Sequence, residues 1–150
     1  MPSSLRELLT EDVIRIKIDA ADWEDAIRKG AQLLIDSGGA EQRYADEIIK
    51  MIHQLGPYVV LAPGLALGHA GPDAGVIHTC FSLMTLSTPV EFGAPDNDPV
   101  DIVFSFAAPN KQEHMQALRD MAMFCSENKN LEFLRKATKA TEVTEYLKKY

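Results

Sequence analysis

Apolar and polar residues along this chain repeat with two different periods. In "VIRIKID", residues 13–19, isoleucines alternate with Arg15 and Lys17, which is typical of a half-buried strand. Elsewhere apolar residues recur three and four positions apart, which is typical of helices that bury one face. Good N-capping residues precede two of these helical segments, Asp22 and Asn110, and Glu113 stands at capping-box spacing from Asn110.

The two periods predict an alternation of strands and helices. Strands are expected at 13–19, 58–63, 76–86 and 100–108, with a further short strand considered at 90–92. Helices are expected between Asp22 and Gly38–Gly39, from Glu41 to Leu55, after Asn110, and at 130–137 and 141–150. The nearly continuous apolar run at 100–108 indicates a central strand covered on both faces. This order predicts an α/β fold with a mixed sheet and helices packed on it.

Composition narrows the class of protein. A chain of 150 residues is most simply one domain, and an apolar share of 46% is enough for a substantial core. The net charge of −7 argues against general nucleic-acid binding and against a polybasic membrane anchor. The composition is therefore that of an ordinary globular protein, and a local basic patch is still compatible with it.

Two further observations concern the compartment. Residues 1–20 carry charges throughout, and no apolar run approaches the length of a membrane span, so we expect a cytoplasmic protein without direct membrane insertion. Cys80 and Cys125 lie in apolar sequence without CxxC spacing. They are interpreted as buried thiols, with a disulfide or a metal pair as the alternative.

The segment "LAPGLALGHAGPDAG", residues 61–75, predicts a loop because it holds four glycines and two prolines. Its glycines leave little side-chain bulk around His69 and free backbone N–H groups to point at an anion. A neutral imidazole can accept a phosphoryl group covalently and pass it on. The alternative is that His69 is a turn residue without chemical function.

The other three histidines are less distinctive. His114 is expected in the first helical turn after Asn110, where the helix dipole favours anions, so it could hold a phosphate oxygen or orient a neighbouring imidazole. The alternative is a histidine at the edge of the core. His53 is interpreted as a half-exposed helix residue and His78 as a structural strand residue.

Several strings are specific enough to suggest a family. The runs "GPYVVLAPGLALGHA", "PDAGV", "TPVEFGAPDNDPVDIVFSFAA" and "KQEHMQAL" resemble the enzyme IIA components of the bacterial phosphotransferase system. The likeness is to the mannitol/fructose-type superfamily and, within it, to the L-ascorbate-specific branch. It implies that residues 1–150 form one EIIA type-2 domain, with a mixed parallel and antiparallel sheet and helices on both faces.

The resemblance also implies an activity. Such phosphocarriers accept a phosphoryl group from phospho-HPr on a histidine and pass it to a cognate EIIB, which serves a membrane EIIC for coupled sugar uptake. The family's active histidine falls on His69, with its tele nitrogen as the candidate acceptor, and the second active-site histidine falls on His114, which would stabilise the phosphate. No metal or other cofactor is implied, and neither cysteine need be reactive.

Two positions depart from the family pattern. Gly68 replaces the usual proline before the active histidine, and Ala70 replaces the usual glycine after it. Alanine would be strained if that position needs a positive φ, whereas Gly68 is expected to loosen the approach to His69. The backbone N–H groups of Gly68, Ala70 and Gly71 are candidates for phosphate binding.

Two other functions are compatible with these residues. One is a regulatory EIIA-like protein, whose phosphorylation state controls a transporter or a transcription factor. The other is a metal-dependent hydrolase that uses His69, Asp73, His78 and His114, although the spacing of His69 and His78 matches no strong zinc pattern. The sugar that the system transports stays undecided.

Overall fold

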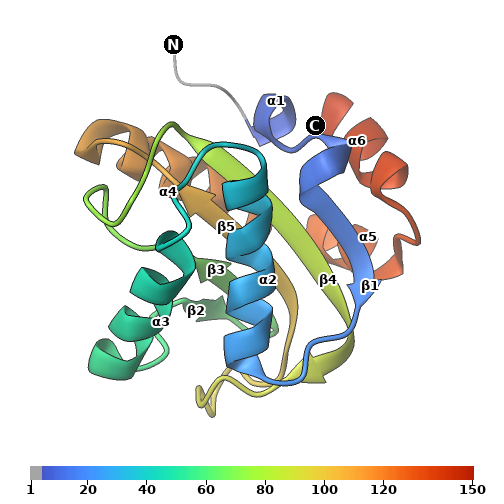
Figure 1. Ribbon diagram of the computed structural model, residues 1–150. Helices are drawn as coiled ribbons and strands as arrows, with labels where there is room; N and C mark the ends of the chain where they lie inside the picture. The colour runs from blue at the N-terminus through green and yellow to red at the C-terminus, as the bar shows by residue number, and fades with distance from the viewer. Residues whose placement is uncertain (1–4) are drawn as a thin grey trace.

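The computed structural model describes residues 5–150, and its centre is a five-stranded sheet with strand order β1-β4-β5-β3-β2 (Figure 1). In chain order the elements are α1 (Leu5–Leu8), the short 3-10 helix η1 (Glu11–Val13), β1 (Ile14–Ile18), α2 (Trp23–Asp36), α3 (Tyr44–Leu55), β2 (Val60–Ala62), β3 (Leu65–Gly68), β4 (Cys80–Val90), β5 (Val100–Ala107), α4 (Lys111–Cys125), α5 (Asn128–Lys136) and α6 (Ala140–Lys148).

The strand directions in the sheet are mixed, as the sequence predicts. β1 pairs with β4 and β3 pairs with β5 in parallel, whereas β4 with β5 and β2 with β3 are antiparallel pairs. β5 is the central strand, and six of its eight residues are consecutive buried positions from Ile102 to Ala107. The central position of β5 explains its continuous apolar run, because helices cover both faces of the sheet there.

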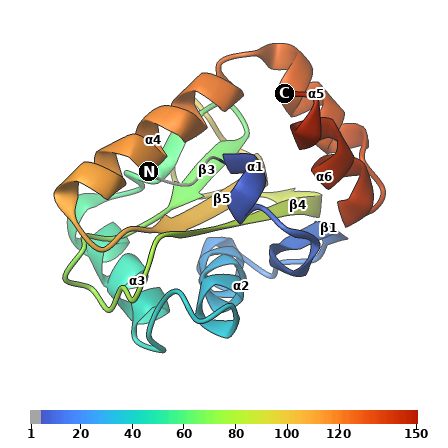
Figure 2. The same ribbon diagram turned by 90° about the horizontal axis from the view of Figure 1, so that it is seen from above.

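Alternate residues of the central strands face two separate layers of helices. Met84 and Val103, which are register partners, belong to the apolar cluster that α2 and α3 cover. Leu83 and Phe104, one residue away, belong to the cluster under α1, α4, α5 and α6. Figure 2 shows the two helical layers on opposite faces of the sheet, which confirms the expected fold.

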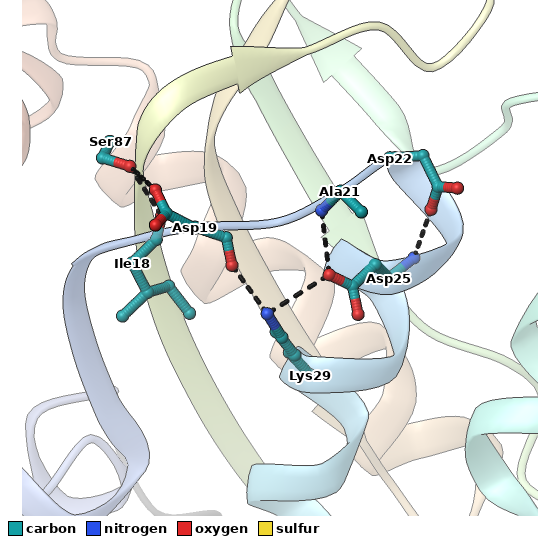
Figure 3. Close-up of polar contacts among 7 residues, drawn as sticks. All are labelled: Ile18, Asp19, Ala21, Asp22, Asp25, Lys29 and Ser87. Carbon is teal, nitrogen blue, oxygen red and sulfur yellow. Dashed lines mark hydrogen bonds and ion pairs between the residues drawn. The ribbon is translucent and has the colours of Figure 1, made fainter.

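Helix α2 begins where the sequence predicts, in a network of side chains that Figure 3 shows. The Asp22 carboxylate accepts the Asp25 N–H at 2.8 Å, and the Asp25 carboxylate accepts the Ala21 N–H at 2.9 Å. Lys29 donates to the Asp19 carbonyl at 2.7 Å and forms an ion pair with Asp25. The reciprocal arrangement satisfies N–H groups that a helix start otherwise leaves unpaired.

The structure departs from the sequence-based elements mainly on either side of the glycine-rich segment. Residues 65–68 form the fully buried strand β3, where we expected loop, and the strand expected at 76–86 begins at Cys80 and continues to Val90. The N–H groups of Ile77 and His78 instead bond to the Gly39 carbonyl. No separate strand forms at 90–92, and α1 was not predicted.

The remaining boundaries move by up to three residues, and the helix expected from Glu41 begins at Tyr44. Within residues 5–150, no helix is long and apolar enough to cross a membrane. The expectation of a charged N-terminus without a signal sequence rests in part on residues 1–4, which lie outside the described residues.

Candidate functional site

Two histidines that are far apart in the sequence lie close together beyond the C-terminal ends of β3 and β5. β3 and β5 run parallel and end beside each other, with Gly68 paired to Ser105. His69 follows the last residue of β3, and His114 lies in the first turn of α4, the helix that follows β5. The centroids of the two imidazole rings are 5.7 Å apart. The fold therefore brings together the two histidines that the sequence singles out.

The start of α4 is held by a capping box that also fastens the segment before β4. The Asn110 Oδ1 accepts the Glu113 N–H at 2.9 Å, and the Asn110 side-chain amide donates to the Glu113 carboxylate at 2.7 Å. The same carboxylate accepts the Thr79 hydroxyl at 2.7 Å. These bonds confirm the predicted N-cap and determine where the first turn places His114.

The His69 ring lies among aromatic rings, so the expectation of a sparsely surrounded side chain is wrong. Phe106 stacks on the imidazole with centroids 5.1 Å apart and planes at 17°. Tyr58 meets it edge-on at 5.3 Å. Neither aromatic residue was identified from the sequence, because a strand-end Phe and a Tyr after a helix are ordinary core positions until the β3–β5 pairing is known.

Hydrogen bonding distinguishes the two nitrogens of His69. Its Nδ1 lies 2.7 Å from the Leu67 carbonyl oxygen, and because a carbonyl can only accept, Nδ1 carries the proton in the neutral ring. The lone pair is therefore on Nε2. Burial lowers the pKa of His69 below its usual 6.5, with a smaller lowering from His114 and an opposing effect of the Leu67 bond. Near neutral pH the ring is uncharged, with a nucleophilic Nε2.

His114 is also kept neutral by its surroundings. Burial lowers the pKa of its ring below 6.5. Its Nδ1 is buried and has no hydrogen-bond partner among the described residues. A buried N–H without an acceptor is rarely tolerated, so the proton is assigned to Nε2. His114 can then donate one hydrogen bond through Nε2.

The three residues expected to surround a phosphate with N–H groups have different environments. Gly68 is buried at the end of β3, where a Cβ would lie 3.1 Å from the Ser105 Oγ, so the expectation that it loosens the approach to His69 is wrong. The Ala70 N–H donates to the Tyr44 hydroxyl at 3.0 Å. A Cβ on Gly71 would meet open space. Of the three residues, only Gly71 has open space where a Cβ would lie.

Ala70 does not have the backbone strain that a positive φ would cause. Within residues 5–150, Lys17 is the only residue other than glycine with a positive φ. Ala70 therefore has an ordinary backbone conformation, and its methyl group is buried. The replacement of the usual glycine by alanine costs no conformational strain here.

The remaining polar candidates do not join the site. His53 is exposed and lies 3.9 Å from the Glu24 carboxylate. His78 is exposed before β4, not inside a strand, and Asp73 is exposed too. Residues 5–150 contain no group of three or more His, Cys, Asp or Glu side chains that could hold a metal ion. The four residues considered for a hydrolase therefore do not form a metal centre.

The two cysteines are free thiols, one buried and one half-buried. Burial raises the pKa of both Cys80 and Cys125 to about 12, which suppresses the reactive thiolate near neutral pH. This environment agrees with the interpretation of structural thiols.

Known proteins resemble this chain over nearly its full length. The family model for the phosphoenolpyruvate-dependent sugar phosphotransferase system, EIIA 2, matches residues 7–150. The ascorbate-specific PTS system EIIA component of Shigella boydii serotype 4 (strain Sb227) is 38% identical over 145 residues, which cover 95% of this chain and 94% of that protein.

Solved structures share the fold over nearly its full length. A putative PTS IIA (PtxA) from Streptococcus mutans superposes with a TM-score of 0.89 at 31% identity, over 98% of this chain and 94% of that one. In the complex of enzyme IIAMTL and phosphorylated enzyme IIBMTL from Escherichia coli, the match has a TM-score of 0.82 at 22% identity, over 95% and 100% of the two chains, and shows the fold alone.

The mixed five-stranded sheet, the helices on both of its faces and the match over residues 7–150 agree with one another. This chain belongs to the EIIA type-2 family of the phosphoenolpyruvate-dependent sugar phosphotransferase system, whose members are phosphotransferase components.

Proposed function

We propose that this protein is a phosphocarrier that accepts a phosphoryl group from phospho-HPr on the Nε2 of His69 and passes it to a cognate EIIB of the ascorbate type. The observation that carries the proposal is the bond between His69 Nδ1 and the Leu67 carbonyl, because it leaves Nε2 as the nucleophile. The ascorbate assignment is supported by a 38% identical relative that carries that name.

The chemistry follows from the two neutral rings. The Nε2 lone pair of His69 attacks phosphorus as the bond to the donor nitrogen breaks, so one P–N bond replaces another. Positive charge then develops on the His69 ring, and the Nδ1–H bond to Leu67 becomes a charge-assisted bond that stabilises it. In transfer to EIIB, the His69 Nε2–P bond breaks as the acceptor side chain of EIIB forms its own bond to phosphorus, and the His69 ring returns to its neutral form.

His114 is the proposed hydrogen-bond donor to the transferring phosphoryl oxygens. Its ring centroid is 5.7 Å from that of His69, and its free Nε2–H is the available donor. A donor placed where negative charge is held in the transition state accelerates transfer without itself reacting. Gly71, two residues after His69, has open space around its Cα.

The test is phosphorylation of purified protein by phosphoenolpyruvate, enzyme I and HPr, followed by mass spectrometry. His69→Ala should take up no phosphoryl group, and His114→Ala should still be phosphorylated but about a hundredfold more slowly. His78→Ala is the matched control because His78 is exposed and is not among the aromatic rings around His69. Full uptake by His69→Ala would exclude the proposal.

A second assay separates transport from regulation. Phosphorylated protein is mixed with an ascorbate-type EIIB, and the label on each protein is followed over time. Rapid transfer supports the phosphocarrier role in sugar uptake. A stable phosphoprotein that does not pass its label on would instead indicate a regulatory EIIA-like protein.

A further inference from the structure

The peptide bond between His69 and Ala70 is held at both of its polar ends by tyrosine hydroxyls. Tyr58 donates its hydroxyl proton to the His69 carbonyl oxygen. The N–H of Ala70 lies in the same peptide plane, points the opposite way and donates to the Tyr44 hydroxyl at 3.0 Å. A planar peptide that is bonded at both ends cannot rotate without breaking a hydrogen bond.

The Tyr44 hydroxyl continues this contact into the sheet. It donates to the Phe106 carbonyl at 2.8 Å, so it links Ala70 to the end of β5. The Phe106 side chain stacks on the His69 ring. The backbone of residues 69–70 and the ring of His69 are thus both fixed against the same residue of the central strand.

Both hydroxyls are protonated throughout the physiological range. Burial raises the pKa of Tyr58 to about 12 and raises that of Tyr44 further above its usual value. Each hydroxyl therefore has a proton to donate, Tyr58 to His69 and Tyr44 to Phe106. Tyr44 is fully buried and comes from α3, and Tyr58 lies in the connection from α3 to β2.

We propose that Tyr58 and Tyr44 are positioning residues, which hold the His69–Ala70 peptide so that His69 Nδ1 meets the Leu67 carbonyl and Nε2 faces the phosphoryl donor. This inference rests on the proposed function of His69. Neither tyrosine touches the phosphoryl group, since Tyr58 contacts His69 through its hydroxyl and ring edge and Tyr44 reaches only backbone atoms.

Tyr58→Phe is the sharpest test, because it keeps the ring contact and removes one hydroxyl. The loss of one hydrogen bond to a half-buried carbonyl predicts an about tenfold fall in the maximal rate of phosphoryl uptake at saturating phospho-HPr, with little change in the KM for phospho-HPr. Tyr150→Phe is the matched control, because Tyr150 is exposed and packs on Phe124, away from the site. It should retain the wild-type rate.

A spectroscopic readout separates positioning from general loss of stability. With ¹⁵N-labelled histidine, NMR of the wild type should show His69 protonated on Nδ1 and unprotonated on Nε2. In Tyr58→Phe the two tautomers should mix, while thermal unfolding remains cooperative. Tyr44→Phe, which leaves the Ala70 N–H and the Phe106 carbonyl without this partner, should produce the same mixing and a larger loss of stability.

The outcomes distinguish this inference from the function it rests on. If His69→Ala still accepts phosphate, the proposed function fails. If His69→Ala is inactive but Tyr58→Phe keeps both the wild-type rate and the wild-type tautomer, the positioning role is overturned. A slower Tyr58→Phe with an unchanged tautomer would also overturn it, because the protonation of the His69 ring nitrogens would then not depend on the Tyr58 hydroxyl.

Discussion

Gly68 and Ser105 face each other across the parallel pair of β3 and β5, one residue before the proposed phosphoryl acceptor. A Cβ on residue 68 would lie 3.1 Å from the Ser105 Oγ and 3.3 Å from the Ile27 Cδ1. The Ser105 Oγ is itself buried and has no hydrogen-bond partner among residues 5–150. The glycine that departs from the family pattern therefore fits a crowded position between the sheet and α2.

This crowding predicts a coupled pair of substitutions. Gly68→Ala should lower the free energy of unfolding by about 1–2 kcal/mol through overpacking. Ser105→Ala, which removes the unpartnered hydroxyl, should leave stability unchanged or raise it by about 1 kcal/mol. The double variant should recover part of the loss, as urea unfolding of all four proteins would measure. Strict additivity would show that Ser105 is not the group that limits residue 68.

The Asn110 cap predicts an effect on activity beyond its effect on stability. Asn110→Ala should cost about 1 kcal/mol of unfolding free energy and also slow phosphoryl uptake, because the first turn of α4 carries His114. Asp22→Ala removes the equivalent cap of α2 (Figure 3), a helix that carries neither histidine. It should cost a similar free energy in chemical denaturation, with unchanged uptake. Equal rates for the two variants would contradict the positioning of His114 by its cap.

The lowered pKa of His69 predicts the acid limit of the activity. Only the neutral ring has a free Nε2 lone pair, and burial moves its protonation below pH 6.5. The midpoint of the fall in the initial rate of phosphoryl uptake with decreasing pH should therefore lie below pH 6.5. The rates are measured at a saturating concentration of phospho-HPr. The pH dependence of phospho-HPr itself is determined separately. A midpoint above 6.5 would contradict the burial effect.

Stability should follow the same two histidines. Both rings have lowered pKa values in the folded protein, so the unfolded chain binds more protons below pH 6.5. Their favourable contribution is present above the unfolded pKa and is lost as pH falls through the folded values. The free energy of unfolding should thus decrease as the pH falls below about 6.5, and the His69→Gln/His114→Gln double variant should show a shallower decrease. An unchanged slope would assign the effect to other groups.

Two glycines with similar backbone angles predict different responses to the same substitution. Gly64 (φ +76°) and Gly93 (φ +84°) both adopt conformations that cost alanine about 1–2 kcal/mol. A Cβ on Gly64 would also lie 2.6 Å from an Arg135 guanidinium nitrogen, whereas Gly93 faces open space. Gly64→Ala should therefore lower the Tm more than Gly93→Ala. Equal losses would show that Arg135 moves aside at no cost.

The sequence carries enough pattern to predict most elements, because β1, β5 and the main helices each bury a regular set of apolar residues. The β5 run at 100–108 even identified its central place in the sheet. β3 could not be predicted in the same way. Its four residues, Leu65–Gly68, are all buried and lie between turn-forming glycines and prolines, so only pairing with β5 makes them a strand.

The functional site was also predictable only in part, because local sequence patterns identify some of its residues and not others. His69 and His114 stood out through a glycine-rich segment and a helix start, which are local signals. Tyr58, Tyr44 and Phe106 carry no local signal, since each contacts His69 or Ala70 only after β3 lies beside β5. Long-range pairing, rather than residue type, decides which aromatic side chains surround the imidazole.

The pairing of β3 with β5, past the intervening β4 in the chain, also has a consequence for how the activity arises during folding. His69 and His114 are separated by the whole of β4 and β5 in sequence, and they meet only when the central parallel ladder has closed. A nascent or partly unfolded chain therefore contains both histidines but no paired site. Phosphoryl uptake would serve as a direct assay of the closed sheet.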